Sequence, residues 1–256
     1  MIHPSAIVHP GAKLAPDVSV GPFSIIGPKV EIDAGTSLDS NVLIDGRTRI
    51  GKNNRIFPFA SIGAAPQDKK YAGEDTAVEI GDGNTIREYV TINRGTAQDV
   101  GTTRIGNDNW IMAYVHFAHD CQIGSHTIFA NYCGLAGHVH IGDWAILGGM
   151  TVVHQFVHVG AHSFTSMGTY LPQDLPPYVM AAGNMAKPYG INSEGLRRRG
   201  FDQDTIAKIK RAYRVLYRSG LGLEEARREL EVLAGESGAV RPLVDFLARS
   251  TRGIIR

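Results

Sequence analysis

The sequence predicts an all-β solenoid followed by a small α-helical domain. Two observations carry this prediction. Apolar residues recur at six-residue intervals over most of the first 160 positions, and past Gly190 the rhythm gives way to helical spacing. Neither a helix of period 3.6 nor a strand of period 2 keeps one apolar residue in six over such a length. A solenoid does, because each short strand directs one anchor inward before the chain turns a corner.

The anchors of this solenoid form three runs, separated by two breaks. They are Ile2, Val8, Leu14, Val20, Ile26, Ile32, Leu38, Ile44, Ile50, Ile56 and Ile62; then Ile80, Ile86 and Ile92; then Ile105, Ile111, Phe117, Ile123, Phe129, Leu135, Ile141, Leu147, Val153 and Val159. A glycine often follows the anchor, where we expect a corner with unusual backbone angles. A small residue two positions before the next anchor lets the walls close tightly.

These hexads resemble the hexapeptide-repeat acyltransferase family, which implies a left-handed parallel β-helix with three hexads per coil. The general preference for crossovers is right-handed, so the hand comes from the resemblance alone. With three hexads per coil, residues 18 apart stack in columns, and Phe117, Leu135 and Val153 form one column. Ile92 joins this column if the segment that follows it is only a bulge.

Two excursion loops break the predicted β-helix domain of residues 1–190, at about residues 63–78 and 94–104. Segments that leave a rigid scaffold often carry function. The first loop is polar and charged, which favours a functional role over a tolerated surface insertion. Residues 191–256 form the predicted helical domain. We expect helices at residues 202–219, 224–234 and 242–252, the first with Asp202 and Asp204 near its start.

Charge separates the two domains, although the formal net charge of the chain is only +1. From Lys187 onward 15 basic residues stand against 9 acidic ones, whereas the preceding part has 11 against 16. No apolar run approaches the length of a membrane span, and hexads that begin at Ile2 leave no room for a secretory signal. Cys121 and Cys133 occupy wall positions, as expected for free thiols in a reduced, cytoplasmic protein.

Eight of the ten histidines fall between His116 and His162. Because His119, His138 and His154 follow Phe117, Leu135 and Val153 by one to three residues, we expect them on the same side of three successive coils. His116 comes directly before Phe117. Such a stack serves proton transfer or metal binding, unless several of its members merely cover exposed faces. A metal would need three neutral imidazoles that converge to about 2.0–2.1 Å from one ion.

Acyl transfer has different requirements, and the same segment meets them. It needs a histidine within reach of a hydroxyl, an acidic partner and a donor for the developing oxyanion. His119 is followed by Asp120, and Gly137 offers a backbone amide one coil further along. No serine or cysteine nucleophile accompanies the histidine, because Cys121 belongs to the wall. The pattern therefore favours direct transfer by a general base over a covalent acyl-enzyme.

Longer motifs narrow the resemblance to the UDP-N-acetylglucosamine acyltransferase family, over essentially the whole chain. The matching segments are QDKKYAGE at 67–74, IRE at 86–88, RGT at 94–96, AHDC at 118–121, LAGH at 135–138, GGM at 148–150, VHQ at 153–155, NSEGLRRRGF at 192–201 and ARSTRG at 248–253. The resemblance implies transfer of a 3-hydroxyacyl chain from acyl carrier protein to the 3-hydroxyl of UDP-N-acetylglucosamine, the first step of lipid A biosynthesis. It implies no cofactor, since the carrier delivers the chain on its phosphopantetheine.

Carried onto the matching positions, the resemblance makes His119 the general base and the Gly137 amide the oxyanion donor. It places the sugar nucleotide against Gln67, Asp68 and Lys70 of the first loop. The other substrate-binding residues would line the path of the sugar, the diphosphate or the phosphopantetheine: His116, His138, His154, Gln155, Asn192, Glu194, Arg198 and Arg199. Arginine suits phosphates through its bidentate fork, although each of these arginines could also be a solvated surface charge.

Two positions depart from the family pattern. Asn93 stands where histidine is frequent, which excludes a titrating role for that position. Met167 stands where members that prefer longer chains have glycine. We expect Met167 to plug the end of a groove along the coils and so to act as an acyl-chain ruler that favours a shorter 3-hydroxyacyl chain.

Family members are homotrimers with active sites between subunits, and the resemblance implies the same assembly here. The basic tail suits an acidic acyl carrier protein. Nucleic acid is a poor partner, because the basic residues of the tail interleave with acids and lack an aromatic platform. Three alternatives stay open: a sister enzyme that N-acylates an amino sugar and carries an extra N-terminal nucleotide-binding domain, a zinc-dependent hydratase of the carbonic anhydrase type, and a purely structural solenoid.

Overall fold

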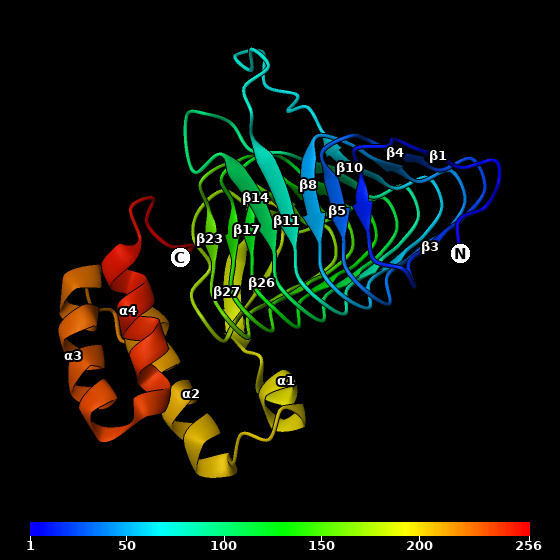
Figure 1. Ribbon diagram of the computed structural model, residues 1–256. Helices are drawn as coiled ribbons and strands as arrows, with labels where there is room; N and C mark the ends of the chain where they lie inside the picture. The colour runs from blue at the N-terminus through cyan, green and yellow to red at the C-terminus, as the bar shows by residue number, and fades with distance from the viewer.

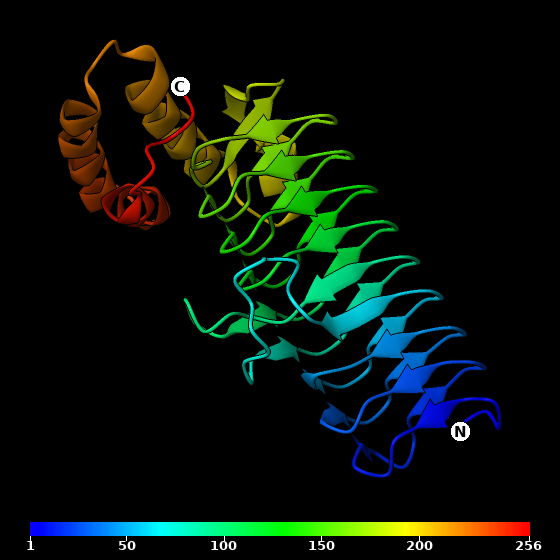
Figure 2. The same cartoon turned by 90° about the horizontal axis from the view of Figure 1, so that it is seen from above.

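The hexads fold into three β-sheets that form the walls of a triangular prism, as a computed structural model of residues 1–256 describes (Figure 1). The prism is a left-handed parallel β-helix, opposite to the general hand of crossover connections. The N-terminus lies at one end of the prism and the helices gather at the other. The successive coils, seen from above, advance steadily along its axis (Figure 2).

The strands are short, and each wall takes one strand from almost every coil. Sheet A contains β3 (Ser19–Val20), β6 (Ser37–Leu38), β9 (Arg55–Ile56), β12 (Thr85–Ile86), β15 (Trp110–Ile111), β18 (Ile128–Phe129), β21 (Ile146–Leu147), β24 (Phe164–Thr165), β26 (Val179–Ala182) and the antiparallel β27 (Lys187–Ile191). Sheet B contains β1 (Ile7–Val8), β4 (Ile25–Ile26), β7 (Leu43–Ile44), β10 (Ser61–Ala64), β13 (Thr91–Asn93), β16 (His116–Phe117), β19 (Gly134–Leu135), β22 (Val152–Val153) and β25 (Tyr170–Leu171). Sheet C contains β2 (Lys13–Leu14), β5 (Val30–Ile32), β8 (Arg47–Ile50), β11 (Ala77–Ile80), β14 (Thr102–Ile105), β17 (Gln122–Ile123), β20 (His140–Ile141) and β23 (His158–Val159).

The anchors point into the prism and form its core. Phe117 pairs with Leu135, and Leu135 with Val153, so the predicted column is confirmed. Ile92 pairs with Phe117 and joins the column despite the intervening loop. Burying such side chains gives about 1.5–3 kcal/mol each, and nearly all anchors from Val20 onward are buried. Both cysteines are also buried as free thiols.

The glycines that follow the anchors are required for a different purpose from the corner geometry that we expected. Gly21 and Gly142 do not adopt a positive φ. A Cβ at Gly21 would lie 2.6 Å from the backbone of Asp39, and one at Gly142 would lie 2.6 Å from the Ala161 nitrogen. These glycines therefore allow adjacent coils to approach closely. The left-handed corner position comes three residues after most anchors, as at Phe23, and non-glycine residues occupy it more often than glycines such as Gly35.

Four α-helices and a short 3-10 turn follow the solenoid. They are α1 (Ser193–Arg198), α2 (Gln203–Arg218), α3 (Leu223–Glu236), η1 (Gly238–Val240) and α4 (Arg241–Arg249). Asp202 caps α2 by accepting a hydrogen bond from the Thr205 amide, and α1 was not predicted. Helices α2 to α4 share a small core around Leu216, Leu230 and Leu247. None of the helices combines the length and apolarity needed to cross a membrane.

Candidate active site

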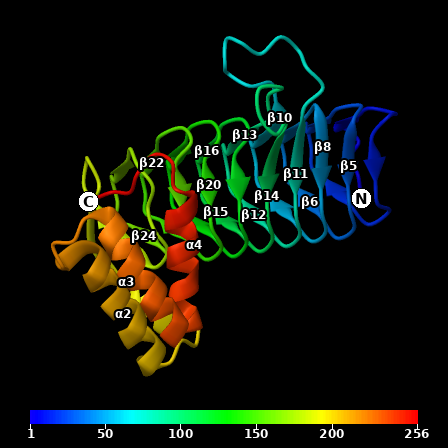
Figure 3. The same ribbon diagram turned by 90° about the vertical axis from the view of Figure 1, so that its left-hand side faces the viewer.

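Both excursion loops leave the prism at the corner where sheet B passes into sheet C. Residues 65–76 join β10 to β11, and residues 94–101 join β13 to β14. Figures 1 and 3 show the two loops projecting from the same side of the molecule. His119 and Asp120 lie at this corner between β16 and β17, and His138 lies there one coil further along. We call this edge of the prism the B–C corner.

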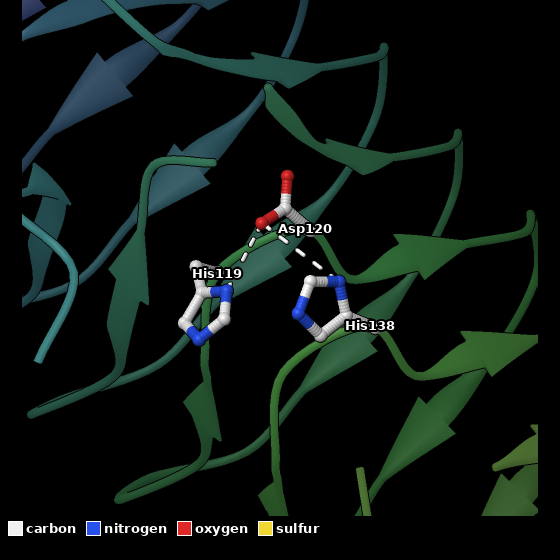
Figure 4. A group of neighbouring side chains, drawn as sticks. All are labelled: His119, Asp120 and His138. Atoms are coloured by element: carbon white, nitrogen blue, oxygen red, sulfur yellow. Dashed lines mark hydrogen bonds and ion pairs between the residues drawn. The ribbon is translucent and has the colours of Figure 1, made fainter. Parts of the chain in front are cut away.

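His119 and Asp120 form a hydrogen-bonded pair, although adjacent residues need not meet. The distance from His119 Nδ1 to Asp120 Oδ2 is 3.0 Å (Figure 4). An Nδ1–H that donates to a carboxylate leaves Nε2 with its lone pair, which is the form of a general base. Nε2 makes no hydrogen bond, and the side chain is 13% exposed. The pair therefore holds an oriented, partly exposed imidazole whose Nε2 is free of hydrogen bonds.

Asp120 is held in place by the second excursion loop, which covers it completely. Its carboxylate accepts hydrogen bonds from the Thr96 amide (2.9 Å) and the Thr96 hydroxyl (2.7 Å). Its own amide donates to Thr103 Oγ1. Burial alone would raise the pKa of Asp120, but the hydrogen bonds from His119 and Thr96 lower it below its ordinary value. Asp120 is thus a carboxylate that stays ionised inside the protein.

Gly137 lies against the His119 ring from the next coil. A Cβ added at Gly137 would lie 2.6 Å from His119 Cε1 and 2.7 Å from His119 Nε2. Only glycine leaves room for the imidazole in this position. The Gly137 amide donates to no acceptor in the chain, so a free N–H is available beside the free imidazole nitrogen. A base and an oxyanion donor in such proximity suit addition to a carbonyl.

His138 occupies the left-handed corner position with φ 64° and closes the other side of the site. Its Nδ1 lies 2.6 Å from Asp99 Oδ2 and 3.9 Å from Asp120 Oδ2. Its ring stacks on Phe156 and meets the His119 ring edge-on at 4.8 Å. The donor atoms of His119, Asp120 and His138 lie within 4.8 Å of one another, a set that could hold a cation. Both Nδ1 atoms, however, already face carboxylates, as expected for proton handling.

The other two histidines of the predicted stack do not join this cluster. His116 points outward from sheet B, with Nδ1 2.7 Å from Thr91 Oγ1, and burial together with the nearby His119 lowers its pKa. His154 is one coil beyond His138, and the only hydrogen bond of its side chain is to the Gln155 carbonyl. Asn93 is nearly buried, and its Oδ1 has no hydrogen-bond partner.

The first excursion loop brings Gln67, Asp68 and Lys70 to the B–C corner, and none of them makes a hydrogen bond or ion pair with His119. Asp68 accepts a hydrogen bond from the Lys70 amide and so shapes the loop. Arg94 ties the loop down by donating to the Tyr71 hydroxyl (3.0 Å). The side chains of Gln67 and Lys70 make no hydrogen bond or ion pair within the chain.

The predicted residues near α1 lie at a different corner, where sheet C passes into sheet A. Asn192 caps α1 through the Gly195 amide, and Glu194 pairs with Arg198. Arg199 lies 3.2 Å from His162 Nδ1 and packs over the Trp144 ring. A single chain does not bring these residues together with His119.

Met167 lies at the third corner, between β24 and β25, where sheet A passes into sheet B, and is 77% exposed. The same corner carries an exposed column of stacked aromatic rings whose centroids are 4.8–5.0 Å apart. This A–B column consists of Phe59, Tyr89, Tyr114 and Tyr132. The predicted site residues are therefore distributed over all three corners of the prism.

Sequence reasoning missed Thr96, Asp99 and Thr103, which hold the cluster from the second loop and the start of β14. Their only signal was the loop itself, since nothing in their spacing indicates that they reach Asp120 or His138.

Comparison with known proteins gives consistent matches over the two parts of the chain. A family model described as UDP-N-acetylglucosamine O-acyltransferase, domain 2, matches residues 174–255, and a bacterial transferase hexapeptide model matches residues 102–137. Relatives named acyl-[acyl-carrier-protein]–UDP-N-acetylglucosamine O-acyltransferase include that of a Janthinobacterium species, 62% identical over 80% of this chain and 79% of the relative. That of Thiobacillus denitrificans is 59% identical over 79% of each.

Solved structures match the whole chain. LpxA from Acinetobacter baumannii has a TM-score of 0.98 and 47% identity, and the match covers 100% of this chain and 99% of that one. The UDP-N-acetylglucosamine acyltransferase of Francisella novicida has a TM-score of 0.98 and 49% identity over 100% of this chain and 94% of that one.

Proposed function

Because this chain belongs to the UDP-N-acetylglucosamine O-acyltransferase family and is an acyltransferase, we propose that it transfers a 3-hydroxyacyl chain from acyl carrier protein to the 3-hydroxyl of UDP-N-acetylglucosamine. This reaction would supply the first step of lipid A biosynthesis. The observation that carries the proposal is the His119–Asp120 pair, with its free Nε2 beside the free Gly137 amide.

The proposed mechanism is one addition and one elimination without a covalent enzyme intermediate. His119 Nε2 removes the proton of the sugar 3-hydroxyl as that oxygen attacks the thioester carbonyl. The Gly137 N–H stabilises the tetrahedral oxyanion. When the C–S bond breaks, the proton on His119 passes to the departing phosphopantetheine thiolate, which restores the base. Asp120 stays ionised throughout and stabilises the imidazolium.

The proposed substrate-binding roles can be grouped by the corner at which each residue lies. Gln67, Asp68 and Lys70 would hold the sugar nucleotide at the B–C corner, where Lys70 is a cation without an internal ion pair. His116, His138, His154 and Gln155 would line the route of the sugar, diphosphate or phosphopantetheine. Asn192, Glu194, Arg198 and Arg199 would meet the nucleotide or the prosthetic group.

A site distributed over three corners needs more than one copy of the chain, and we infer a homotrimer. The A–B column is exposed, with Tyr114 at 46% and Tyr132 at 53%, and Ile25, Leu43 and Val152 are exposed elsewhere on sheet B. Exposed aromatic side chains that gather along one corner favour contact with another copy. If sheet B faces a three-fold axis, the B–C corner of one chain meets the A–B corner of its neighbour. Met167 would then lie along the acyl chain that starts at His119 of the neighbouring chain.

The reaction is tested by incubating the purified protein with UDP-N-acetylglucosamine and a ladder of 3-hydroxyacyl carrier proteins. The expected product is the 3-O-acyl ester of the sugar nucleotide, identified by mass and by its alkali lability. An N-acylated amino sugar as the preferred product would instead support the sister activity. Activity that requires added zinc and is lost with a chelator would support the hydratase-type site.

A further inference from the structure

The second excursion loop does more than cover Asp120. It leaves the coil of Ile92, crosses the coil of Phe117, where Thr96 binds Asp120, and reaches His138 on the following coil. There Asp99 Oδ2 lies 2.6 Å from His138 Nδ1. A contact of this length is typical of a charge-assisted hydrogen bond.

His138 forms its hydrogen bond with the carboxylate of Asp99 and not with that of Asp120. Asp120 Oδ2 lies 3.9 Å from the same nitrogen, beyond hydrogen-bond length. Its carboxylate already receives hydrogen bonds from His119 and Thr96. The cluster thus contains two separate aspartate–histidine pairs, Asp120 with His119 and Asp99 with His138.

Three contacts fix the His138 ring in this second pair. One face packs parallel to Phe156, at 4.2 Å between centroids, and the edge meets His119. The side chain is only 11% exposed, whereas Asp99 is 37% exposed at the rim of the loop. Stacking restrains the plane of the ring but does not choose which nitrogen carries the proton. A carboxylate at Nδ1 makes that choice, since it requires N–H on that side.

We propose that Asp99 is a positioning residue for the transfer reaction, which holds His138 as the Nδ1–H tautomer and presents its Nε2 to the substrate beside His119. The inference rests on the proposed function for the identity of the substrate. It adds to that function a second oriented imidazole, whose role is to accept a hydrogen bond from the acceptor sugar or to donate one when protonated. The proposal also explains why the second excursion loop extends over two coils, since one coil carries Asp120 and the next carries His138.

The kinetic test compares Asp99→Ala with Gln98→Ala, a neighbouring exposed residue of the same loop without a side-chain hydrogen bond. Asp99→Ala should lower kcat/KM about 10- to 100-fold, the range expected when a hydrogen bond to a charged group is lost. Gln98→Ala should stay close to the wild-type value. Asp99→Asn, which keeps an acceptor oxygen, should recover part of the loss. Equal losses in Asp99→Ala and Gln98→Ala would overturn the proposal.

A double-mutant comparison separates action through His138 from other effects. In a His138→Gln background, Asp99→Ala should cost little more activity. A full additional loss in that background would show that Asp99 does not act through His138, and the proposal would fail.

A spectroscopic arm needs no substrate and so separates this inference from the proposed function. In protein labelled with 15N-histidine, with the His138 signals assigned by their absence in His138→Gln, the neutral ring should show Nδ1 protonated and Nε2 bare. Asp99→Ala should shift that balance toward Nε2–H. An unchanged tautomer contradicts the inference even if transfer activity is present, while absent transfer with the expected tautomer contradicts only the proposed function.

Discussion

At the scale of single residues, the site depends on what the second loop and the next coil do to one imidazole. Asp120 sets the tautomer of His119, Thr96 keeps Asp120 buried and ionised, and Gly137 leaves space for the ring. Replacement of Asp120 or Thr96 should lower activity although neither residue touches substrate. The position of the His119 imidazole is therefore fixed before any ligand arrives, which is the condition for efficient proton transfer.

Gly137→Ala tests the spatial part of this argument. The new methyl group would overlap the His119 ring, so the ring must move although the backbone N–H remains. We expect kcat/KM to fall about 100-fold, as for a misplaced catalytic group. Gly235→Ala is the control, because an added Cβ there would meet nothing within 4 Å and α3 lies away from the B–C corner. Equal activities of the two variants, with assembly intact, would show that the position of the ring is not limiting.

Met167→Gly tests the proposed acyl-chain ruler. Removal of this exposed side chain should move the preference of the enzyme toward longer 3-hydroxyacyl chains, measured by ranking kcat/KM over the carrier-protein ladder. The wild-type enzyme should prefer a shorter chain than the variant. An unchanged ranking would leave Met167 without a role in chain-length selection.

At the scale of elements, the sequence predicted the strands better than the loops. The hexad anchors predicted the column of Phe117, Leu135 and Val153. With one inward side chain every six residues and three walls per coil, residues 18 apart must stack. The anchors could not show that the corner three residues after most anchors is left-handed, since non-glycine residues such as His138 and Phe156 usually occupy it. Stacking between coils holds those residues there, and stacking is a tertiary effect.

The site was predictable only in part, for the same reason. His119 and its neighbour Asp120 were identified, but their contact depends on the loop that folds over Asp120. The predicted histidine stack divides, because His138 turns toward the cluster while His154 remains outside it. Helix α1 was missed because it is only six residues long and contains Gly195.

The junction between α1 and the solenoid predicts a pH dependence. Burial and the nearby Arg199 lower the pKa of His162 to about 4 from an ordinary value of 6.5. The unfolded chain therefore binds a proton more readily than the folded one between these values, so stability should decrease as pH falls through this window. His162→Gln cannot titrate, and its thermal midpoint should decrease less than that of the wild type between pH 7 and pH 4. Parallel curves for the two proteins would contradict this assignment.

At the scale of the whole molecule, the residues of the proposed site lie on three edges of the prism. The B–C corner carries His119, the A–B corner carries the aromatic column and Met167, and the remaining corner carries Arg199. A rigid solenoid cannot fold these edges onto one another. Association of copies along sheet B would bring the B–C and A–B corners together, whereas the corner that carries Arg199 lies opposite sheet B.

Tyr114→Glu tests this assembly. A charge in the middle of the A–B column would be costly to bury between copies. We expect the mass measured by light scattering to fall from three times the chain mass of 27.7 kDa toward a single chain, with loss of transfer. Val232→Glu, a similar change at an exposed apolar residue of α3, should leave the trimer intact. A wild-type protein that is monomeric at working concentration would contradict the shared site.

The central claim is that His119 is the general base of acyl transfer, and single-turnover transfer by His119→Gln tests it most directly. The variant should assemble normally and bind UDP-N-acetylglucosamine, while the transfer rate falls about 10²- to 10⁴-fold, the usual contribution of a positioned acid–base group. His126→Gln, which changes a histidine stacked on Trp144 away from the B–C corner, should retain the wild-type rate. Transfer by His119→Gln at the wild-type rate would contradict the account.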